Sequence, residues 1–124
     1  MPPIEFRAWD LNEGEYISWD RLITTRYNQD YNIDNNISDV VLSVLTDKYI
    51  ILEQYTGVND KNGKKSFYND IAKTREGISL IKYWEGNAWL EGIDWLGLIL
   101  LSDRNAEFEV IGNIRENSEL RNTI

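Results

Sequence analysis

The chain contains no cysteine and no histidine among its 124 residues. Without cysteine it forms no disulfide and no thiolate metal site, and without histidine it lacks the commonest general base and transition-metal ligand. A Ser-His-Asp or Cys-His catalytic arrangement is therefore excluded. No P-loop, dinucleotide-binding fingerprint or nucleophile elbow occurs either. We predict that the protein is not an enzyme and holds neither a cofactor nor a tightly bound metal.

Proline and long apolar runs are also scarce. The two prolines are Pro2 and Pro3, so every later strand is free to pair. No apolar run approaches the roughly 20 residues that a membrane helix needs. The N-terminus lacks the basic and apolar regions of a signal peptide. We expect a cytoplasmic protein that does not contact a membrane.

Positive charge is in deficit, with 13 basic residues against 21 acidic ones and a net charge of −8. Phosphate backbones repel such a surface on average, so direct nucleic-acid binding is not expected. The basic residues are scattered. Lys61, Lys64 and Lys65 form the only loose cluster in the sequence, which is typical of a solvated loop.

The residues that are present indicate a β-rich domain. Hydrophobic residues make up 42% of the chain, and five Trp, seven Tyr and three Phe favour strands. The length fits one domain over 1–124, with a possible subdivision into N-terminal hairpins (1–55) and a barrel-like part (56–124). Short strands between turn residues predict a mainly β fold, all-β or α+β with little helix. They also predict a small barrel-like core of antiparallel hairpins.

Two hairpins are the clearest local predictions. They join residues 4–9 to 15–24, through a turn at Gly14, and residues 78–84 to 88–93. Trp84 and Trp89 flank the second turn and are expected to pair across it. Further strands are expected at 40–45, 49–55, 67–73 and 107–114, with loops at 25–37 and 56–66. A helix remains the alternative for parts of 38–55 and 94–101, because periodicity does not distinguish a helix from a strand over such short apolar runs.

Three stretches carry a family resemblance. They are Phe6-Arg7-Ala8-Trp9-Asp10, then residues 54–64 (QYTGVNDKNGK) followed by Asp70-Ile71-Ala72-Lys73, and finally residues 109–117 (EVIGNIREN). In this order and spacing the chain resembles the YopX family of phage and prophage proteins over nearly its whole length. The resemblance singles out ten residues for a structural or a binding role: Trp9, Tyr55, Thr56, Gly57, Asp60, Asn62, Gly63, Asp70, Gly112 and Asn113.

The resemblance implies a phage or prophage origin in a bacterial cytoplasm, together with self-assembly. It implies no activity, because the family has none assigned. Asn69 stands where the family has glycine. Asparagine tolerates a left-handed backbone better than most residues, so we expect the turn there to survive.

The acidic motif residues have both a chemical and a structural interpretation. Asp60-Lys61-Asn62-Gly63 resembles part of a calcium loop, but Val58 and Asn69 stand where the first and the closing ligand belong, so we predict a tight turn. Asp70 is able in principle to act as a general base or to bind Mg²⁺. We predict instead that it accepts backbone N–H bonds and fixes a turn. Glu107 and Glu109 are expected on one solvent-facing side of a strand.

Five aromatic residues raise the question of base stacking: Tyr55, Tyr68, Trp84, Trp89 and Trp95. Stacking platforms normally sit in basic grooves, so we predict packing in the core or at a subunit interface. The leading hypothesis is a phage or prophage accessory protein that assembles with itself and binds a host or phage protein. The alternative is an acidic nucleic-acid-associated or DNA-mimicking regulator of host machinery.

Overall fold

The fold is mainly β, as the sequence predicts. The structure is a computed structural model that describes residues 4–22, 49–103, 106–117 and 119. The chain divides into two compact units, Glu5–Gln54 and Tyr55–Ile124, the second including Met1–Ile4. We call them the N-terminal and the C-terminal unit and describe each by itself. That the whole chain is a single domain stays a prediction.

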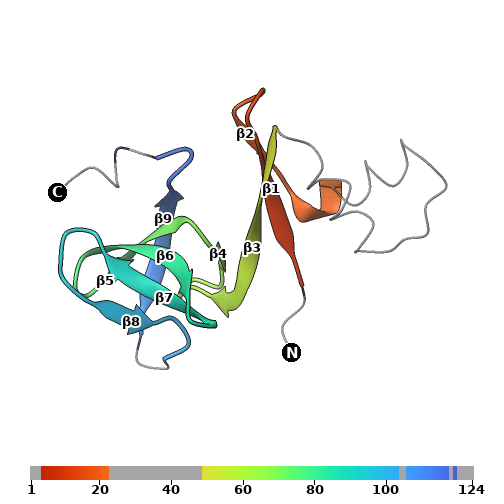
Figure 1. Cartoon of the computed structure of the whole chain (residues 1–124). Coiled ribbons are helices and arrows are strands. Elements are labelled where there is room, and N and C mark those ends of the chain that lie inside the picture. The colour runs from red at the N-terminus through yellow and green to blue at the C-terminus, as the bar shows by residue number, and fades with distance from the viewer. Residues whose placement is uncertain (1–3, 23–48, 104–105, 118, 120–124) are drawn as a thin grey trace. The chain divides into compact units, whose positions relative to one another are not determined.

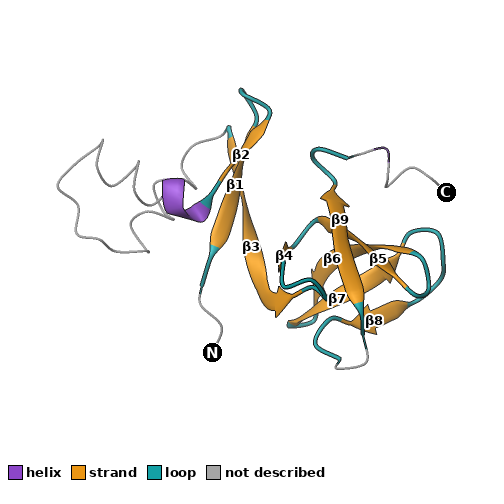
Figure 2. Ribbon diagram, turned by 180° about the vertical axis from the view of Figure 1, so that it is seen from behind, coloured by secondary structure: helices purple, strands orange, loops and turns teal. Residues whose placement is uncertain are grey.

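The described residues contain nine strands in two antiparallel sheets (Figure 1). One sheet has the order β2-β1-β3-β4, and the other has the order β8-β7-β6-β5-β9. The five-stranded sheet curls into part of a barrel (Figure 2). The strands are β1 (Phe6–Asp10), β2 (Glu15–Ile17), β3 (Ile50–Asn59), β4 (Lys65–Phe67), β5 (Asp70–Thr74), β6 (Ile78–Trp84), β7 (Asn87–Gly92), β8 (Leu98–Leu100) and β9 (Phe108–Asn113).

The predicted N-terminal hairpin is confirmed, but its second strand is shorter than predicted. The Asp10 carboxylate accepts the N–H groups of Asn12 and Glu13 at 2.8 and 3.1 Å, and Gly14 closes the turn with a φ of 66°. The prediction of a strand over 15–24 is wrong at residues 18–22, because Ser18 begins a helical turn; residues 23 and 24 lie outside the described residues. Its hydroxyl accepts the Arg21 N–H at 3.2 Å, as in a helix N-cap.

The small core of the N-terminal unit lies between this hairpin, the helical turn at residues 19–22 and the first half of β3. Ala8 and Leu22 are buried there. The partly buried side chains packed against them are Ile17, Trp19, Ile50 and Leu52. The predicted loop at 25–37 and the predicted strand at 40–45 lie outside the described residues.

Strand β3 extends further than the predicted 49–55. Its first half pairs with β1 and its second half with β4, so the predicted loop over 56–66 is wrong at its start and end. The Thr56 and Ser66 hydroxyls lie 2.6 Å apart across the β3–β4 pair. Polar side chains that bond across a hairpin explain why a polar segment forms strand here.

The second predicted hairpin is confirmed as β6–β7. Its two turn residues, Glu85 and Gly86, have φ values of 48° and 81°, as a type I′ turn requires. Trp84 and Trp89 meet edge to face with ring centroids 6.0 Å apart, and the Trp89 indole N–H donates to the Trp84 carbonyl at 2.9 Å. Tryptophan pairing across the turn is therefore confirmed.

The remaining strands of the C-terminal unit agree in part with the strands predicted from the sequence. The predicted strand at 67–73 is interrupted at Tyr68-Asn69, where β4 ends and β5 begins. The undecided segment at 94–101 forms the short strand β8, and the predicted strand at 107–114 is β9. One side of the curled sheet carries the core, whose buried members are Ala72, Ile81, Leu90, Leu101 and Phe108. No helix in the described part of the chain is long and apolar enough to cross a membrane.

Candidate functional site: motif corners and an apolar outer face

Asp60 sits at the turn between β3 and β4 and joins that turn to β9. One carboxylate oxygen accepts the N–H groups of Asn62 and Lys64, both at 2.9 Å. The other accepts the N–H of Val110 at 2.9 Å, across 50 residues of sequence. The side chain is only 6% exposed. Both oxygens of Asp60 are thus occupied by backbone donors, and Asn62 and Gly63 belong to the turn that it organises.

The surroundings of Asp60 favour its charged form. Burial raises the pKa of the carboxyl, but the bonds from the Val110, Lys64 and Asn62 amides, with the nearby Lys64 charge, outweigh burial and lower the pKa below its usual value. A carboxylate that accepts several N–H bonds is stabilised as an anion. Asp60 therefore acts as a fixed acceptor that holds a turn, which agrees with the predicted tight turn.

Tyr55, Thr56 and Gly57 form an irregular part of the β3–β4 pair. The pairing register shifts between Tyr55 and Asn59, and Gly57 has a φ of 87° within the shift. The Thr56 hydroxyl contacts the Ser66 carbonyl oxygen at 3.1 Å, and the buried Tyr55 ring packs against Phe67 with centroids 5.8 Å apart. Glycine is suited to this bulge because it adopts positive φ without steric cost.

Asp70 opens β5, directly after the corner at Tyr68-Asn69. It is almost fully buried, and its carboxylate accepts the Phe67 N–H at 2.8 Å. Asn69 has a φ of 78°, the left-handed conformation expected where the family has glycine. The Asn69 N–H donates to the Ile81 carbonyl at 2.9 Å, and its own carbonyl accepts the Ile114 N–H at 3.1 Å. Asp70 therefore fixes a corner, as predicted.

The Asn69 backbone gives a direct test of this corner. We expect Asn69→Ala to lower the free energy of unfolding by about 1 kcal/mol relative to Asn69→Gly, because only alanine places a Cβ in the left-handed region. Both variants remove the asparagine side chain, so their difference isolates the backbone term. Urea denaturation followed by tryptophan fluorescence measures it. Equal stabilities would contradict the strained conformation.

Asn113 ends β9, opposite Asp70 on β5, and closes the next turn. Its side-chain oxygen accepts the N–H groups of Arg115 and Glu116 at 3.0 and 2.8 Å, while its amide donates to the Glu116 carboxylate at 2.9 Å. Gly112 leaves room for this turn, because a Cβ there would lie 2.5 Å from the Asn117 side-chain oxygen. The last motif therefore also builds a corner.

Trp9 is the one motif residue in the N-terminal unit. It is half-buried on β1 and packs edge to face on Tyr16 at 4.8 Å. The motif residues are thus not gathered into one site. Those of the C-terminal unit lie in turns and corners, and among the described residues no group of three or more acidic side chains is arranged to hold a metal ion.

A buried ion pair in the N-terminal unit was not predicted. Arg7 on β1 contacts Glu53 on β3 at 2.9 Å, with the two side chains 14% and 1% exposed. The Tyr16 hydroxyl donates to the same Glu53 oxygen at 2.8 Å, and the Arg7 guanidinium lies 4.3 Å from the Tyr16 ring centroid. A glutamate within the apolar run of β3 is the one sequence signal that could have indicated such a pair.

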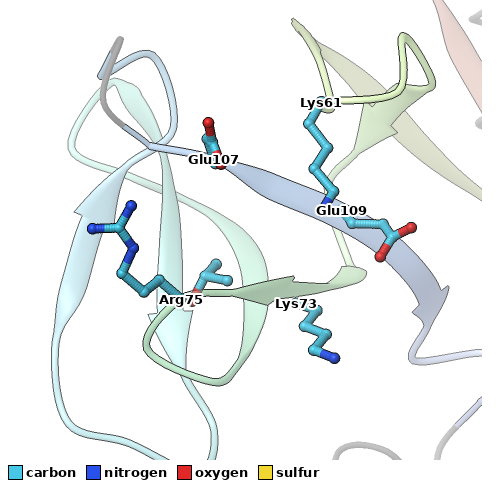
Figure 3. Close-up of a pocket in the computed structure, with 6 residues that line it drawn as sticks. Lys61, Lys73, Arg75, Glu107 and Glu109 are labelled. Atoms are coloured by element: carbon cyan, nitrogen blue, oxygen red, sulfur yellow. The ribbon is translucent and has the colours of Figure 1, made fainter.

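A shallow charged pocket of about 270 Å³ lies beside β5 and β9 (Figure 3). It is lined by Lys61, Lys73, Thr74, Arg75, Glu107 and Glu109. In Figure 3 the Lys73 and Arg75 side chains point away from each other. Because carboxylates and cations share the lining, the pocket is not a basic groove of the kind that follows a phosphate backbone. Glu107 precedes β9 and is exposed, whereas Glu109 lies on the strand and is half-buried.

The aromatic residues do not form a single face. Tyr55 is buried, Tyr68 packs edge to face on Tyr83 at 5.9 Å, and the half-buried Trp95 donates its indole N–H to the Ser79 hydroxyl at 3.0 Å. Trp84 and Trp89 instead share the side of the sheet opposite the core. This arrangement favours packing over base stacking, as predicted.

That opposite side carries a group of apolar side chains, two of which are exposed. Paired residues of adjacent strands share a face, so the register of β6, β7 and β8 places five apolar side chains together. We call this set the outer face: Leu80, Trp84, Trp89, Leu98 and Leu100. Trp84 and Leu98 are 48% and 46% exposed, and the ion pair between Lys82 and Glu91 lies among them at 2.8 Å. Isolated exposed leucines are ordinary, but a cluster containing two tryptophans is typical of an interaction surface.

The chain is similar to known proteins in both sequence and fold. The family model described as YopX protein matches residues 5–121. No curated protein matches the chain. It is similar to the crystal structure of protein EF1440 from Enterococcus faecalis, with 24% identity, a TM-score of 0.63, and coverage of 98% of this chain and 99% of that one. This likeness supports the fold, and the family model covers nearly the whole sequence. The chain belongs to the YopX family.

Proposed function

We propose that this protein is a non-enzymatic accessory protein of a phage or prophage, which works in the bacterial cytoplasm by assembling with copies of itself and by binding a host or phage protein. The observation that carries the proposal is the outer face. It is a partly exposed cluster of tryptophan and leucine in a chain whose net charge is −8. Membership of the YopX family supports the phage or prophage origin.

The motif residues support a scaffold role over a catalytic one. Asp60 and Asp70 accept backbone N–H bonds, and Asn113 bonds the turn that follows it. A general base needs to reach a proton on a substrate, whereas these groups are directed at the chain itself. Their contacts are those of residues that fix turns, which leaves the outer face as the region suited to a partner.

Burial of apolar side chains of the outer face favours assembly. Fully burying a side chain of the size of Leu98 contributes roughly 1.5–3 kcal/mol. Repulsion between acidic copies opposes contact, but it is screened beyond about 8 Å at physiological salt. An interface that is aromatic at its centre and charged at its rim accommodates both effects.

Self-assembly is tested by size-exclusion chromatography with light scattering on the full chain. We expect a mass that is a multiple of 14.5 kDa at micromolar concentration. A mass of one chain at every concentration would overturn the self-assembly proposal. It would mean that the outer face serves a different partner or none.

The net charge of −8 motivates a second candidate, an acidic regulator that competes with nucleic acid for a basic groove on a host protein. The two candidates differ in one observation. The regulator would bind a host DNA-binding protein and be displaced by DNA, whereas the assembling protein keeps its partners when DNA is added.

A further inference from the structure

The two edge strands of the five-stranded sheet differ in whether their outward-facing backbone groups are hydrogen-bonded. At the β9 edge, the Asp60 carboxylate accepts the Val110 N–H at 2.9 Å, and the Lys61 N–H donates to the Phe108 carbonyl at 3.0 Å. The turn between β3 and β4 therefore occupies the edge-facing groups of β9. No further strand is able to use that part of the edge without displacing the turn.

At the β8 edge, some backbone groups have no backbone partner among the residues that the structure describes. The Gly92 N–H donates to the Gly97 carbonyl, and the Leu101 N–H to the Ala88 carbonyl, both at 3.0 Å. Because hydrogen-bonded pairs alternate along an antiparallel ladder, Ile99 faces β7, and the backbone groups of Leu98 and Leu100 point away from it.

Leu98 and Leu100 differ in which of their outward-facing backbone groups remain available for hydrogen bonding. The Leu100 carbonyl accepts the Asp103 N–H at 3.0 Å, which closes the turn after β8. Within the described part of the chain, neither the N–H nor the carbonyl of Leu98 has a backbone partner. Leu98 thus presents one donor and one acceptor side by side.

Apart from its short length of three residues, β8 lacks the features that protect exposed edges. Native edge strands usually carry charge, proline or a bulge that prevents pairing with another chain. Residues 96–101 read Leu-Gly-Leu-Ile-Leu-Leu and hold no charge, whereas Glu107 and Glu109 lie at or beside β9. Leu96 is 100% exposed and Leu98 is 46% exposed, so the segment is open to a partner.

We propose that β8 is the assembly edge: it pairs antiparallel with β8 of a second copy, so that Leu98 lies opposite Leu98 of that copy. In this register each Leu98 N–H donates to the other Leu98 carbonyl, across a twofold axis. The proposal rests on the proposed self-assembly and names the strand edge through which two copies meet.

A second copy fits this edge better than an unrelated strand for two reasons. One residue that offers both a donor and an acceptor is complementary to itself, which is what a twofold contact requires. In addition, two copies with a net charge of −8 repel each other least where they meet through an uncharged segment. Pairing joins the two five-stranded sheets into one and brings the outer faces of both copies, with Leu98, Leu100 and Trp89, side by side.

Two substitutions at Leu98 test the edge without removing a bond to β7. Leu98→Pro deletes the edge-facing N–H, and proline is tolerated on an edge strand whose N–H faces outward. Leu98→Lys adds a charge to the edge, as natural protected edges do. Ile111→Lys is the matched control, because Ile111 is also partly exposed (37%) but lies on β9, whose edge is occupied at Phe108 and Val110. Circular dichroism checks that each variant keeps its β structure.

Light scattering and sedimentation on the full-length variants give the readout. We expect Leu98→Pro and Leu98→Lys each to weaken assembly at least tenfold in apparent dissociation constant, and Ile111→Lys to leave it within twofold. In the wild type, the Leu98 amide should also gain protection from hydrogen exchange as concentration rises. Assembly that is unchanged in both Leu98 variants, with no added protection of that amide, would overturn the β8 edge but leave self-assembly in place. A wild type that stays a single chain would overturn both.

Discussion

Replacing Glu53 by glutamine should lower the free energy of unfolding by about 3–5 kcal/mol, the cost of breaking a buried ion pair from one side. Glu53 is 3% exposed, contacts Arg7 at 2.9 Å and accepts the Tyr16 hydroxyl. Without its carboxylate, residue 53 no longer offsets the charge of the partly buried Arg7 guanidinium beside it. Urea denaturation followed by tryptophan fluorescence measures the loss, since Trp9 and Trp19 report on this unit.

Two further variants distinguish the effect of breaking this buried ion pair from the effect of removing any carboxylate charge. Glu91→Gln breaks the exposed pair with Lys82 at 2.8 Å and should cost about 0–1 kcal/mol. The double variant Arg7→Met with Glu53→Leu should recover most of the stability, because apolar replacement of a whole buried pair is often neutral. A Glu53→Gln protein as stable as the Glu91→Gln protein would show that the pair contributes little.

Replacing Asp60 by alanine should cost about 3 kcal/mol, because it removes the buried carboxylate that accepts the N–H groups of Asn62, Lys64 and Val110. The loss should also loosen the β9 edge. Hydrogen exchange should therefore be faster at the Val110 amide than in the wild type. Thermal or urea unfolding gives the size of the effect.

The same carboxylate makes stability depend on pH in the acid range. The pKa of Asp60 is lowered in the folded state, so its contribution is fully present above the pKa of the unfolded carboxyl and is lost as pH falls through the folded pKa. The wild type should lose more stability than Asp60→Ala on acidification below about pH 4.

Asp94→Ala is the matched control for Asp60→Ala, since Asp94 is exposed and accepts a single backbone N–H, from Ile78 at 2.7 Å. It should reduce stability by about 1 kcal/mol. If Asp60→Ala and Asp94→Ala cost the same, or if the acid slope of Asp60→Ala equals that of the wild type, then the carboxylate does not hold the turn as described.

Local signals predicted the hairpins well. The turn glycines at residues 14 and 86, with alternating apolar residues on either side, fix β1–β2 and β6–β7 through chemistry within a few residues. Asn69 was identified as a left-handed position for the same reason. The helical turn after Ile17 was missed because the Ser18 cap was not recognised within an apparently continuous strand.

Long-range contacts explain what the sequence did not reveal. Arg7 and Glu53 are 46 residues apart, and Asp60 reaches Val110 across 50. Neither pairing leaves a periodic pattern, because each depends on strand order and register. The open edge at β8 likewise follows from the sheet order, which places β8 and β9 at its two ends. An undecided apolar run at 94–101 became an edge strand for the same reason.

We propose that this YopX protein assembles through the uncharged β8 edge. The most direct measurement is sedimentation equilibrium of the full chain over a range of concentrations, at low and at high salt. We predict a mass that is a multiple of 14.5 kDa and assembly that persists or strengthens as salt screens the charge of −8. A single-chain mass under all conditions, or an assembly that dissociates as salt is raised, would contradict the claim.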